Sequence, residues 1–238
     1  MKASAISAVK LNEMRYYPVH LDIQGRNCLV VGGGAVGTRK VETLRACGAQ
    51  VTVVSPAATE PLRDLAAQGA IRLRLRDYAS EDLSEMFLVI GATDDEALNR
   101  RISADAEQRR ILCNIADRPE VCNFILPSIL QRGDLTITVS TSGKSPAFAK
   151  KLRRTLAAQY GPEYAAFLDL MGAIRQRLLA EAHAPEAHKA LFEALIESDL
   201  PALIRANQPD AINALLEKVL GKGYRVEELL DRVLKNCA

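Results

Sequence analysis

Several features that would assign a sequence to a class at once are missing from this one. It has no tryptophan, only three histidines, and no run of 18 apolar residues, so we expect no membrane-spanning helix and no membrane partner. Its 31 Lys and Arg residues nearly balance its 29 Asp and Glu residues. The resulting net charge of +2 argues against a general nucleic-acid binder.

Cysteine is present in a pattern that does not suggest disulfides. The five residues are odd in number and widely spaced, and no CxxC pair occurs; they are Cys28, Cys47, Cys113, Cys122 and Cys237. Cys28 and Cys113 lie in apolar runs typical of buried strands. We therefore expect a reduced, cytoplasmic protein rather than a disulfide-bonded scaffold.

The common catalytic and metal-binding motifs are also missing. There is no Tyr-x-x-x-Lys, no G-x-S-x-G and no H-E-x-x-H. His183 and His188 are five residues apart with Pro185 between them, so we expect solvated histidines and no metal site. A carboxylate is then the remaining candidate for a general base.

What the sequence does contain is a regular alternation of apolar runs and helical patterns. Such continuous apolar strands, separated by helices, indicate a parallel sheet covered on both faces, and predict an α/β fold of Rossmann type. Strands are expected at 27–31, 50–54, 71–75, 87–90 and 111–114, and helices at 35–46, 61–68 and 95–109.

The pattern changes after the fifth strand. Residues 135–140 alternate as a half-exposed strand does, and a lone strand of this kind predicts pairing in a homodimer. Ser145 and Pro146 are the N-cap and first residue types of a helix that runs to Gln159. From residue 161 onward the composition predicts a helical appendage of four or five helices.

A glycine turn follows the first strand. Gly32-Gly33-Gly34-Ala35-Val36-Gly37 matches G-x-G-x-x-G between a predicted strand and a predicted helix, which is the context that dinucleotide binding requires. We expect Gly32, Gly34, Ala35, Val36 and Gly37 to contact the cofactor. The alternative is a tight turn with no ligand.

Two further strand ends are expected at the cofactor site. Ser55 and Pro56 occupy the place where an acidic residue usually binds the ribose, and no arginine stands immediately beside them, so NAD and NADP remain open. Thr93 and Asp94 follow the fourth strand and either contact the cofactor or cap the next helix. Asp117 follows the fifth strand and is either a general base or a turn former.

Taken together, several segments resemble one family, that of precorrin-2 dehydrogenase and sirohydrochlorin ferrochelatase, which includes the N-terminal half of sirohaem synthase. The similarity covers about residues 14–160. Its most specific parts are Asn114-Ile115-Ala116-Asp117 and Ser140-Thr141-Ser142-Gly143-Lys144-Ser145-Pro146. Thr141 stands where the family has a conspicuous serine.

The resemblance implies an NAD-dependent dehydrogenase of precorrin-2, with Asp117 as the catalytic residue. It also implies substrate contacts from Asn114, Thr141 and Ser142, and possible ferrochelation, with Fe²⁺ or Co²⁺ as a transient substrate. The implied organisation is a loose extension at 1–13, an NAD-binding Rossmann domain at 14–126, a dimerisation segment at 127–160 and an all-helical C-terminal domain at 161–238.

Residues 144–154 hold five cations and no acidic residue: Lys144, Lys150, Lys151, Arg153 and Arg154. Such a basic run suits a tetrapyrrole substrate that carries many carboxylates, and we expect Lys144 and Lys150 to bind it. The alternative is a solvated helix face. A second interpretation of the whole chain is a non-enzymatic module that senses NAD(H).

Overall fold

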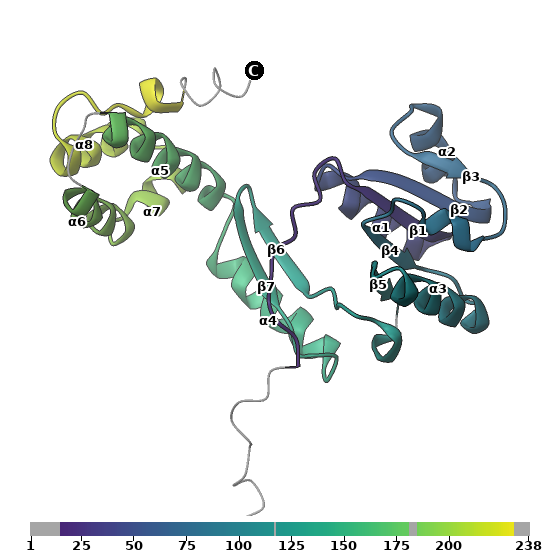
Figure 1. The fold of residues 1–238 in the computed structure, drawn as a ribbon. Helices are drawn as coiled ribbons and strands as arrows, with labels where there is room; N and C mark the ends of the chain where they lie inside the picture. The colour runs from purple at the N-terminus through teal and green to yellow at the C-terminus, as the bar shows by residue number, and fades with distance from the viewer. Residues whose placement is uncertain (1–14, 117, 181–184, 231–238) are drawn as a thin grey trace, which may run out of the picture. The chain divides into compact units, whose positions relative to one another are not determined.

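Two units make up the part of the chain that the computed structural model describes, which is residues 15–116, 118–180 and 185–230. The boundary between the units lies between Leu126 and Pro127 (Figure 1). The first unit holds the predicted parallel sheet, and the second holds a small antiparallel sheet and the C-terminal helices.

The sheet of the first unit confirms the predicted Rossmann-type fold. Its five parallel strands lie in the order β3-β2-β1-β4-β5. The chain builds outward from β1 to β3 and then crosses back to β4, so a topological switch point lies between β1 and β4. In open α/β sheets this point, at the carboxyl ends of the strands, is where ligands bind. The strands are β1 (Asn27–Gly33), β2 (Gln50–Ala58), β3 (Arg72–Arg74), β4 (Leu88–Gly91) and β5 (Leu112–Ile115).

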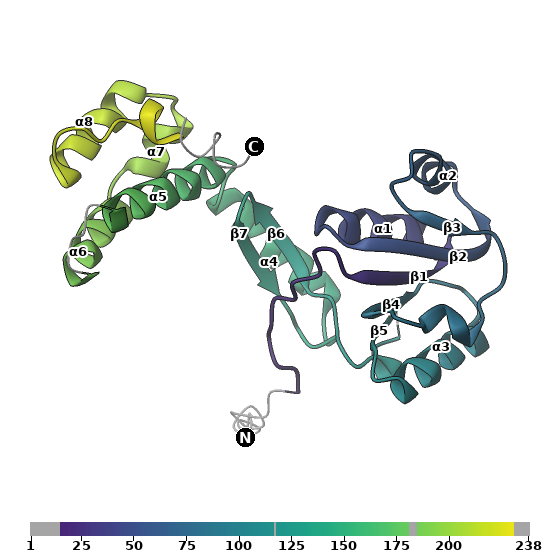
Figure 2. The same cartoon turned by 45° about the horizontal axis from the view of Figure 1, so that its top comes forward.

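Helices cover both faces of this sheet because the side chains of each strand alternate between them. Cys28 and Val30 of β1 pack on one face with residues of α1 (Ala35–Ala46) and α2 (Glu60–Ala67). Leu29 and Val31 pack on the other face with α3 (Glu96–Gln108). Figure 2 shows α1 and α2 on one side of the sheet and α3 on the other. Two short 3₁₀ helices, η1 (Ser80–Leu83) and η2 (Pro119–Val121), complete the unit.

Both strand cysteines are buried, as expected. Cys28 is fully buried and Cys113 is nearly so. Burial raises the pKa of Cys28 to about 11 and the pKa of Cys113 to about 12, with smaller contributions from neighbouring groups. Both thiols therefore stay protonated at neutral pH and act as small apolar core residues.

The outer edge of the sheet carries a buried carboxylate. The Asp82 side chain is 1% exposed and accepts hydrogen bonds from Arg74 at 2.8 Å and from Arg76 at 2.5 Å. Arg76 donates a second bond at 2.7 Å, and the backbone N–H of Ala79 donates another at 3.0 Å. Burial alone would raise the pKa of Asp82, but these hydrogen bonds outweigh it and lower the pKa.

The second unit begins with a hairpin that corrects the sequence analysis. The expected strand at 135–140 is β7 (Leu135–Val139), and it pairs antiparallel with β6 (Ser128–Arg132) of the same chain. Leu130 faces Ile137 across the pair and is buried. The prediction of a lone strand was wrong, because β6 is short and its apolar residues are adjacent, which hides the alternation. A partner strand from a second chain is therefore not required.

Helices make up the rest of the second unit. α4 (Pro146–Gln159) packs on the hairpin, and Ser145 caps it by accepting a hydrogen bond from the N–H of Phe148 at 3.3 Å. The following helices share one apolar core that includes Phe167, Leu170 and Leu216. They are α5 (Glu163–Ala180), α6 (Pro185–Ile196), α7 (Leu200–Arg205) and α8 (Pro209–Leu220).

His188 of α6 is buried rather than solvated, contrary to expectation, and His183 lies outside the described residues. Among the helices that the structure describes, none combines the length and the apolar character needed to cross a bilayer.

Candidate functional site

Three glycines of the glycine turn, Gly32, Gly33 and Gly37, lie where any side chain would collide with the backbone. A Cβ on Gly32 would meet the carbonyl oxygen of Ala92, and one on Gly33 would meet that of Ala57. A Cβ on Gly37 would meet the carbonyl oxygen of Gly32 itself. These glycines therefore let the ends of β2 and β4 and the start of α1 close on one another. The requirement for Gly33 is not visible in the motif, because it comes from β2.

Gly34 differs from the other three. It is exposed, and no atom lies within 4 Å of the place where its Cβ would be. It is the N-cap of α1, yet no side chain caps this helix and no acidic residue lies in its first turn. The start of α1 is therefore left without a side-chain partner among the described residues, and the space beside Gly34 is open. This is the arrangement that a pyrophosphate of a dinucleotide requires, so the turn fits that cofactor.

The end of β2 forms a bulge where it pairs with the glycine turn. Pairing shifts from Val31 with Val54 to Gly33 with Ala58, so three residues of β2 form a bulge opposite one residue of β1. The strand continues four residues beyond its expected end at Val54 for this reason. Within the bulge Ser55 is buried, at 8% exposure, whereas Pro56 is exposed.

A bond between two threonines fastens this segment to α1. The hydroxyls of Thr38 and Thr59 lie 2.8 Å apart, and the N–H of Thr59 donates to the carbonyl of Gly33 at 2.9 Å. Sequence analysis missed both threonines because no local motif links residues that are 21 positions apart. Together with the bulge, they fix the β2 side of the site.

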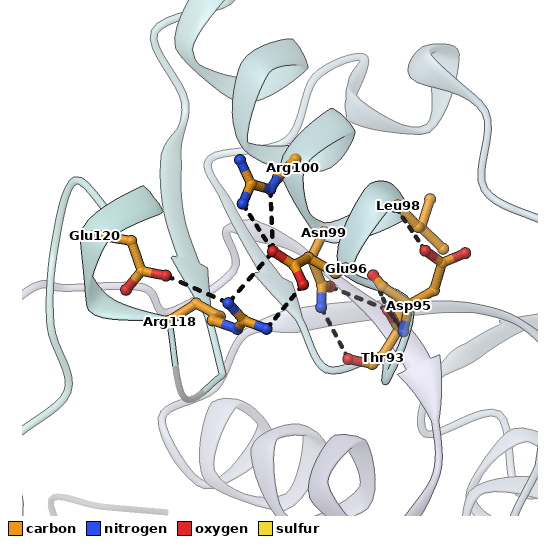
Figure 3. A network of polar contacts seen from close by, with 8 residues as sticks. All are labelled: Thr93, Asp95, Glu96, Leu98, Asn99, Arg100, Arg118 and Glu120. Atoms are coloured by element: carbon orange, nitrogen blue, oxygen red, sulfur yellow. Dashed lines mark hydrogen bonds and ion pairs between the residues drawn. The ribbon is translucent and has the colours of Figure 1, made fainter.

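A hydrogen-bonded loop follows β4 (Figure 3). Its first residue, Ala92, lies against Gly32 of the glycine turn. Asp95 is the N-cap of α3 and accepts a bond from the N–H of Leu98 at 3.0 Å. The hydroxyl of Thr93 lies 3.1 Å from Oδ1 of the buried Asn99, whose amide donates back to the carbonyl of Thr93 at 2.9 Å. Neither Thr93 nor Asp94 is the N-cap, but Thr93 supports the loop and Asp94 is exposed.

Charged side chains join this loop to the segment after β5, as Figure 3 shows. Glu96 accepts from Arg100 at 2.7 Å and from Arg118 at 3.2 Å, and Arg118 also reaches Glu120 at 3.7 Å. The hydrogen bond from Arg100 and the charge of Arg118 lower the pKa of Glu96. The network ties the residues directly after the expected catalytic residue to the start of α3.

The expected catalytic residue, Asp117, lies outside the described residues, and its role stays a prediction. The neighbouring backbone is fixed on one side, since the N–H of Ala116 donates to the carbonyl of Gly91 at 2.8 Å. Asn114, expected to contact the substrate, is buried and donates to the carbonyl of Phe124 at 3.1 Å. In the structure it supports the segment that follows β5.

The remaining predicted substrate residues lie in the second unit: Thr141, Ser142 and Lys144 in the loop before α4, and Lys150 on α4. The hydroxyl of Thr141 accepts from the N–H of Ser145 at 3.1 Å, and the carbonyl of Thr141 accepts from the backbone N–H of Lys144 at 2.9 Å. Ser142 has φ of +52° and is followed by Gly143 at +81°. The loop is therefore a tight turn with exposed Ser142 and Lys144 side chains.

The positive charges of the basic run, on this loop and on α4, are not neutralised by acidic side chains of the described chain. None of its five cations forms an ion pair with a residue that the structure describes. Four are exposed and Arg153 is half-buried; the exposed ones are Lys144, Lys150, Lys151 and Arg154. An uncompensated cluster beside the N-terminus of a 14-residue helix is suited to anionic groups.

Within the described ranges, no three His, Cys, Asp or Glu side chains gather in a way that could hold a metal ion.

Family models match both units. A putative NAD(P)-binding family matches residues 19–128, and the family of the central part of sirohaem biosynthesis proteins matches residues 132–159. The first match covers the sheet and all strand ends described above. The second covers most of the hairpin and α4.

Similar proteins are found among curated sequences and solved structures. A siroheme synthase of Thioalkalivibrio sulfidiphilus is 39% identical over 88% of this chain and 43% of its own length. A siroheme synthase of Nitrosococcus oceani is 34% identical over 90% of this chain and 46% of its own length. The chain thus spans less than half the length of these relatives. The solved structure of SirC, a precorrin-2 dehydrogenase, matches with a TM-score of 0.70 and 26% identity, covering 86% of this chain and 98% of SirC.

Proposed function

Because this chain is a relative of the siroheme synthases and of the precorrin-2 dehydrogenase SirC, we propose that it oxidises precorrin-2 to sirohydrochlorin with NAD. The observation that carries the proposal is the pairing of an uncapped, glycine-lined helix N-terminus with a fold that matches nearly all of SirC. Because the match extends over nearly the full length of SirC, it favours an enzyme over a module that only senses NAD(H).

Oxidation of precorrin-2 removes a hydride and a proton from the macrocycle. NAD supplies the hydride acceptor when it is bound. The N–H groups at the start of α1 hold its pyrophosphate, and Gly34 allows the close approach. The proton needs a base, and we assign that role to the carboxylate of Asp117, which follows β5 in the sequence.

The substrate carries several carboxylates, so its recognition needs cations and hydrogen-bond donors. We propose that Lys144 and Lys150 bind these carboxylates and that Thr141 and Ser142 supply hydroxyl groups. The support is the exposure of the lysines and their lack of ion pairs within the described chain. Asn114 contributes indirectly, through the segment that it supports.

Ferrochelation is a second proposal, favoured by relatives that are named siroheme synthases. Insertion of Fe²⁺ or Co²⁺ as a substrate displaces two N–H protons from sirohydrochlorin; Asp117 is proposed to accept one of them, and the other passes to water. An anaerobic assay with sirohydrochlorin and Fe²⁺ tests this step apart from oxidation. Metal insertion no faster than without protein would reject it.

We also propose that the chain acts as a homodimer in the cytoplasm. The apolar side chains of Phe148 on α4 and Ile129 on β6 are 55% and 43% exposed, and the hairpin leaves two strand edges open. Sedimentation of the wild type and of Phe148→Glu tests the dimer. The wild type is expected at twice the chain mass, and a monomeric wild type would contradict the proposal.

The experiment that tests the main activity uses the purified chain, NAD and precorrin-2 under anaerobic conditions. Sirohydrochlorin and NADH are expected to appear in equal amounts, each followed by its absorbance. Omission of NAD controls for spontaneous oxidation. A chain that binds NADH but leaves precorrin-2 unchanged would be a sensor, and the proposed function would be wrong.

A further inference from the structure

The segment that follows residue 117 returns along the outer edge of β5. In the described chain no strand pairs with this edge, so its backbone N–H groups need other acceptors. Side chains supply them: Oδ1 of Asn123 accepts from the N–H of Cys113 at 2.8 Å, and Sγ of Cys122 accepts from the N–H of Ile115 at 3.1 Å. The edge of β5 is therefore closed by two neighbouring side chains of the returning segment.

The thiol of Cys122 also contacts the other side of residue 117. It donates to the carbonyl of Arg118 at 3.1 Å, and the carbonyl of Ile115 lies 3.4 Å from the same sulfur. Ile115 precedes Asp117 by two positions, and Arg118 follows it directly. One side chain thus bonds to the backbone on both sides of the residue to which we assign the role of base.

The surroundings of Cys122 keep its thiol in place and protonated. The residue is half-buried, and the carbonyl of the preceding residue, Val121, accepts a bond from the hydroxyl of Ser103 on α3 at 2.7 Å. Burial raises the pKa of Cys122 above its ordinary value. The S–H proton is therefore present at neutral pH and can bond to the carbonyl of Arg118.

We propose that Cys122 is a positioning residue for Asp117, acting through the backbone of Ile115 and Arg118. The inference rests on the proposed function, with Asp117 as its base. A base that is displaced from the proton it removes loses rate, whereas binding of the substrate and of NAD depends on other groups. Loss of the thiol contacts should therefore appear in kcat rather than in KM or in nucleotide affinity.

The anaerobic assay with NAD and precorrin-2 tests the proposal on two variants. Cys122→Ala removes the bonds to both backbone positions and is expected to lower kcat about 10- to 100-fold, while the KM for precorrin-2 and the affinity for NADH change less than about twofold. Cys122→Ser keeps a donor and an acceptor, so it should recover most of the kcat. Thermal unfolding shows whether each variant is folded at the assay temperature.

Ser103→Ala is the matched control, because it removes a hydrogen bond from the same segment at a point that does not contact the residues beside Asp117. It should lower the melting temperature but keep kcat within about twofold of the wild type.

A double-mutant cycle separates positioning of the base from a general loss of structure. On Asp117→Asn, which lacks the base, Cys122→Ala should cause no further loss of kcat, because there is no base left to position. If Cys122→Ala does not fold, Cys122→Ser takes its place in the cycle, and its smaller loss should likewise vanish on Asp117→Asn.

An unchanged kcat in Cys122→Ala would overturn the inference and leave the proposed function intact. Equal losses of kcat in Cys122→Ala and Ser103→Ala would also overturn it, since the thiol would then only stabilise the segment. A full further loss of kcat on Asp117→Asn would do the same. A wild type that does not oxidise precorrin-2 would instead reject the proposed function, and the inference with it.

Discussion

Replacing Gly34 with aspartate is expected to stabilise the empty protein while it abolishes nucleotide binding. Gly34 is the N-cap of α1, with φ −80° and ψ −173°, and a Cβ there meets nothing within 4 Å. Aspartate suits this position because its carboxylate accepts N–H bonds from the first turn. The gain is a few tenths of a kcal/mol for the cap, and about 0.3–1 kcal/mol for a negative charge at the helix N-terminus. The melting temperature of the first unit should rise by a few degrees.

The same carboxylate opposes the pyrophosphate. It occupies the N–H groups that the phosphates need, and it adds like charge beside them. Two unit charges 4 Å apart repel by about 4 kcal/mol at an effective dielectric constant of 20. Because about 1.4 kcal/mol is a tenfold change, NADH affinity should fall at least about 100-fold even after screening by salt.

Two measurements on one variant check the argument. Thermal unfolding gives the stability of Gly34→Asp, and fluorescence titration gives its NADH affinity. Gly34→Asn is the matched control, since it has nearly the same size and also caps helices but carries no charge. Its loss of affinity should be clearly smaller. A Gly34→Asp variant that binds NADH like the wild type would refute the assignment of this helix end to the pyrophosphate.

Three further predictions concern turnover, packing and pH. Asp117→Asn should lower kcat for sirohydrochlorin formation by about 10²–10⁴-fold with NADH affinity unchanged; near-normal turnover would remove its role as base. Gly37→Ala, whose Cβ would meet the carbonyl of Gly32, should lower the free energy of unfolding by about 1–3 kcal/mol in urea titrations, and an unchanged midpoint would contradict the packing argument. Asp82→Asn should lower the free energy of unfolding by about 2–3 kcal/mol at neutral pH, because it removes the buried carboxylate that pairs with Arg74 and Arg76. The fold lowers the pKa of Asp82, so the ionised carboxylate contributes to the free energy of unfolding. This stabilisation is fully present above the pKa of the unfolded chain, about 3.9, and is lost as pH falls through the pKa of the folded protein. The difference between Asp82→Asn and wild type should therefore shrink in acid, and a constant difference would argue against the ionised carboxylate.

The sequence by itself determined the features that depend on near neighbours. Apolar and β-branched runs predicted the five parallel strands. The inner strands are buried on both faces, whereas β3, at the edge of the sheet, alternates between arginine and leucine and is largely exposed. The approximate ranges predicted for α1 and α4 agree with the observed helices, since glycine signals lie beside α1 and a serine–proline signal lies at the start of α4. Gly48 ends α1 with φ of +76°, a conformation that glycine adopts without strain. The glycine turn was likewise recognisable from six adjacent residues.

The tertiary structure alone decided which distant segments meet. The need for glycine at Gly33 comes from Ala57, and the attachment of β2 to α1 comes from the hydrogen bond between Thr38 and Thr59. The pairing of β7 within its own chain depends on β6, whose short run gives no clear period. Periodicity and capping report the chemistry of a few consecutive residues. Contacts between strand ends depend on how the whole sheet is ordered, and for that reason the sequence located the glycine turn but not the two threonines that attach the end of β2 to it.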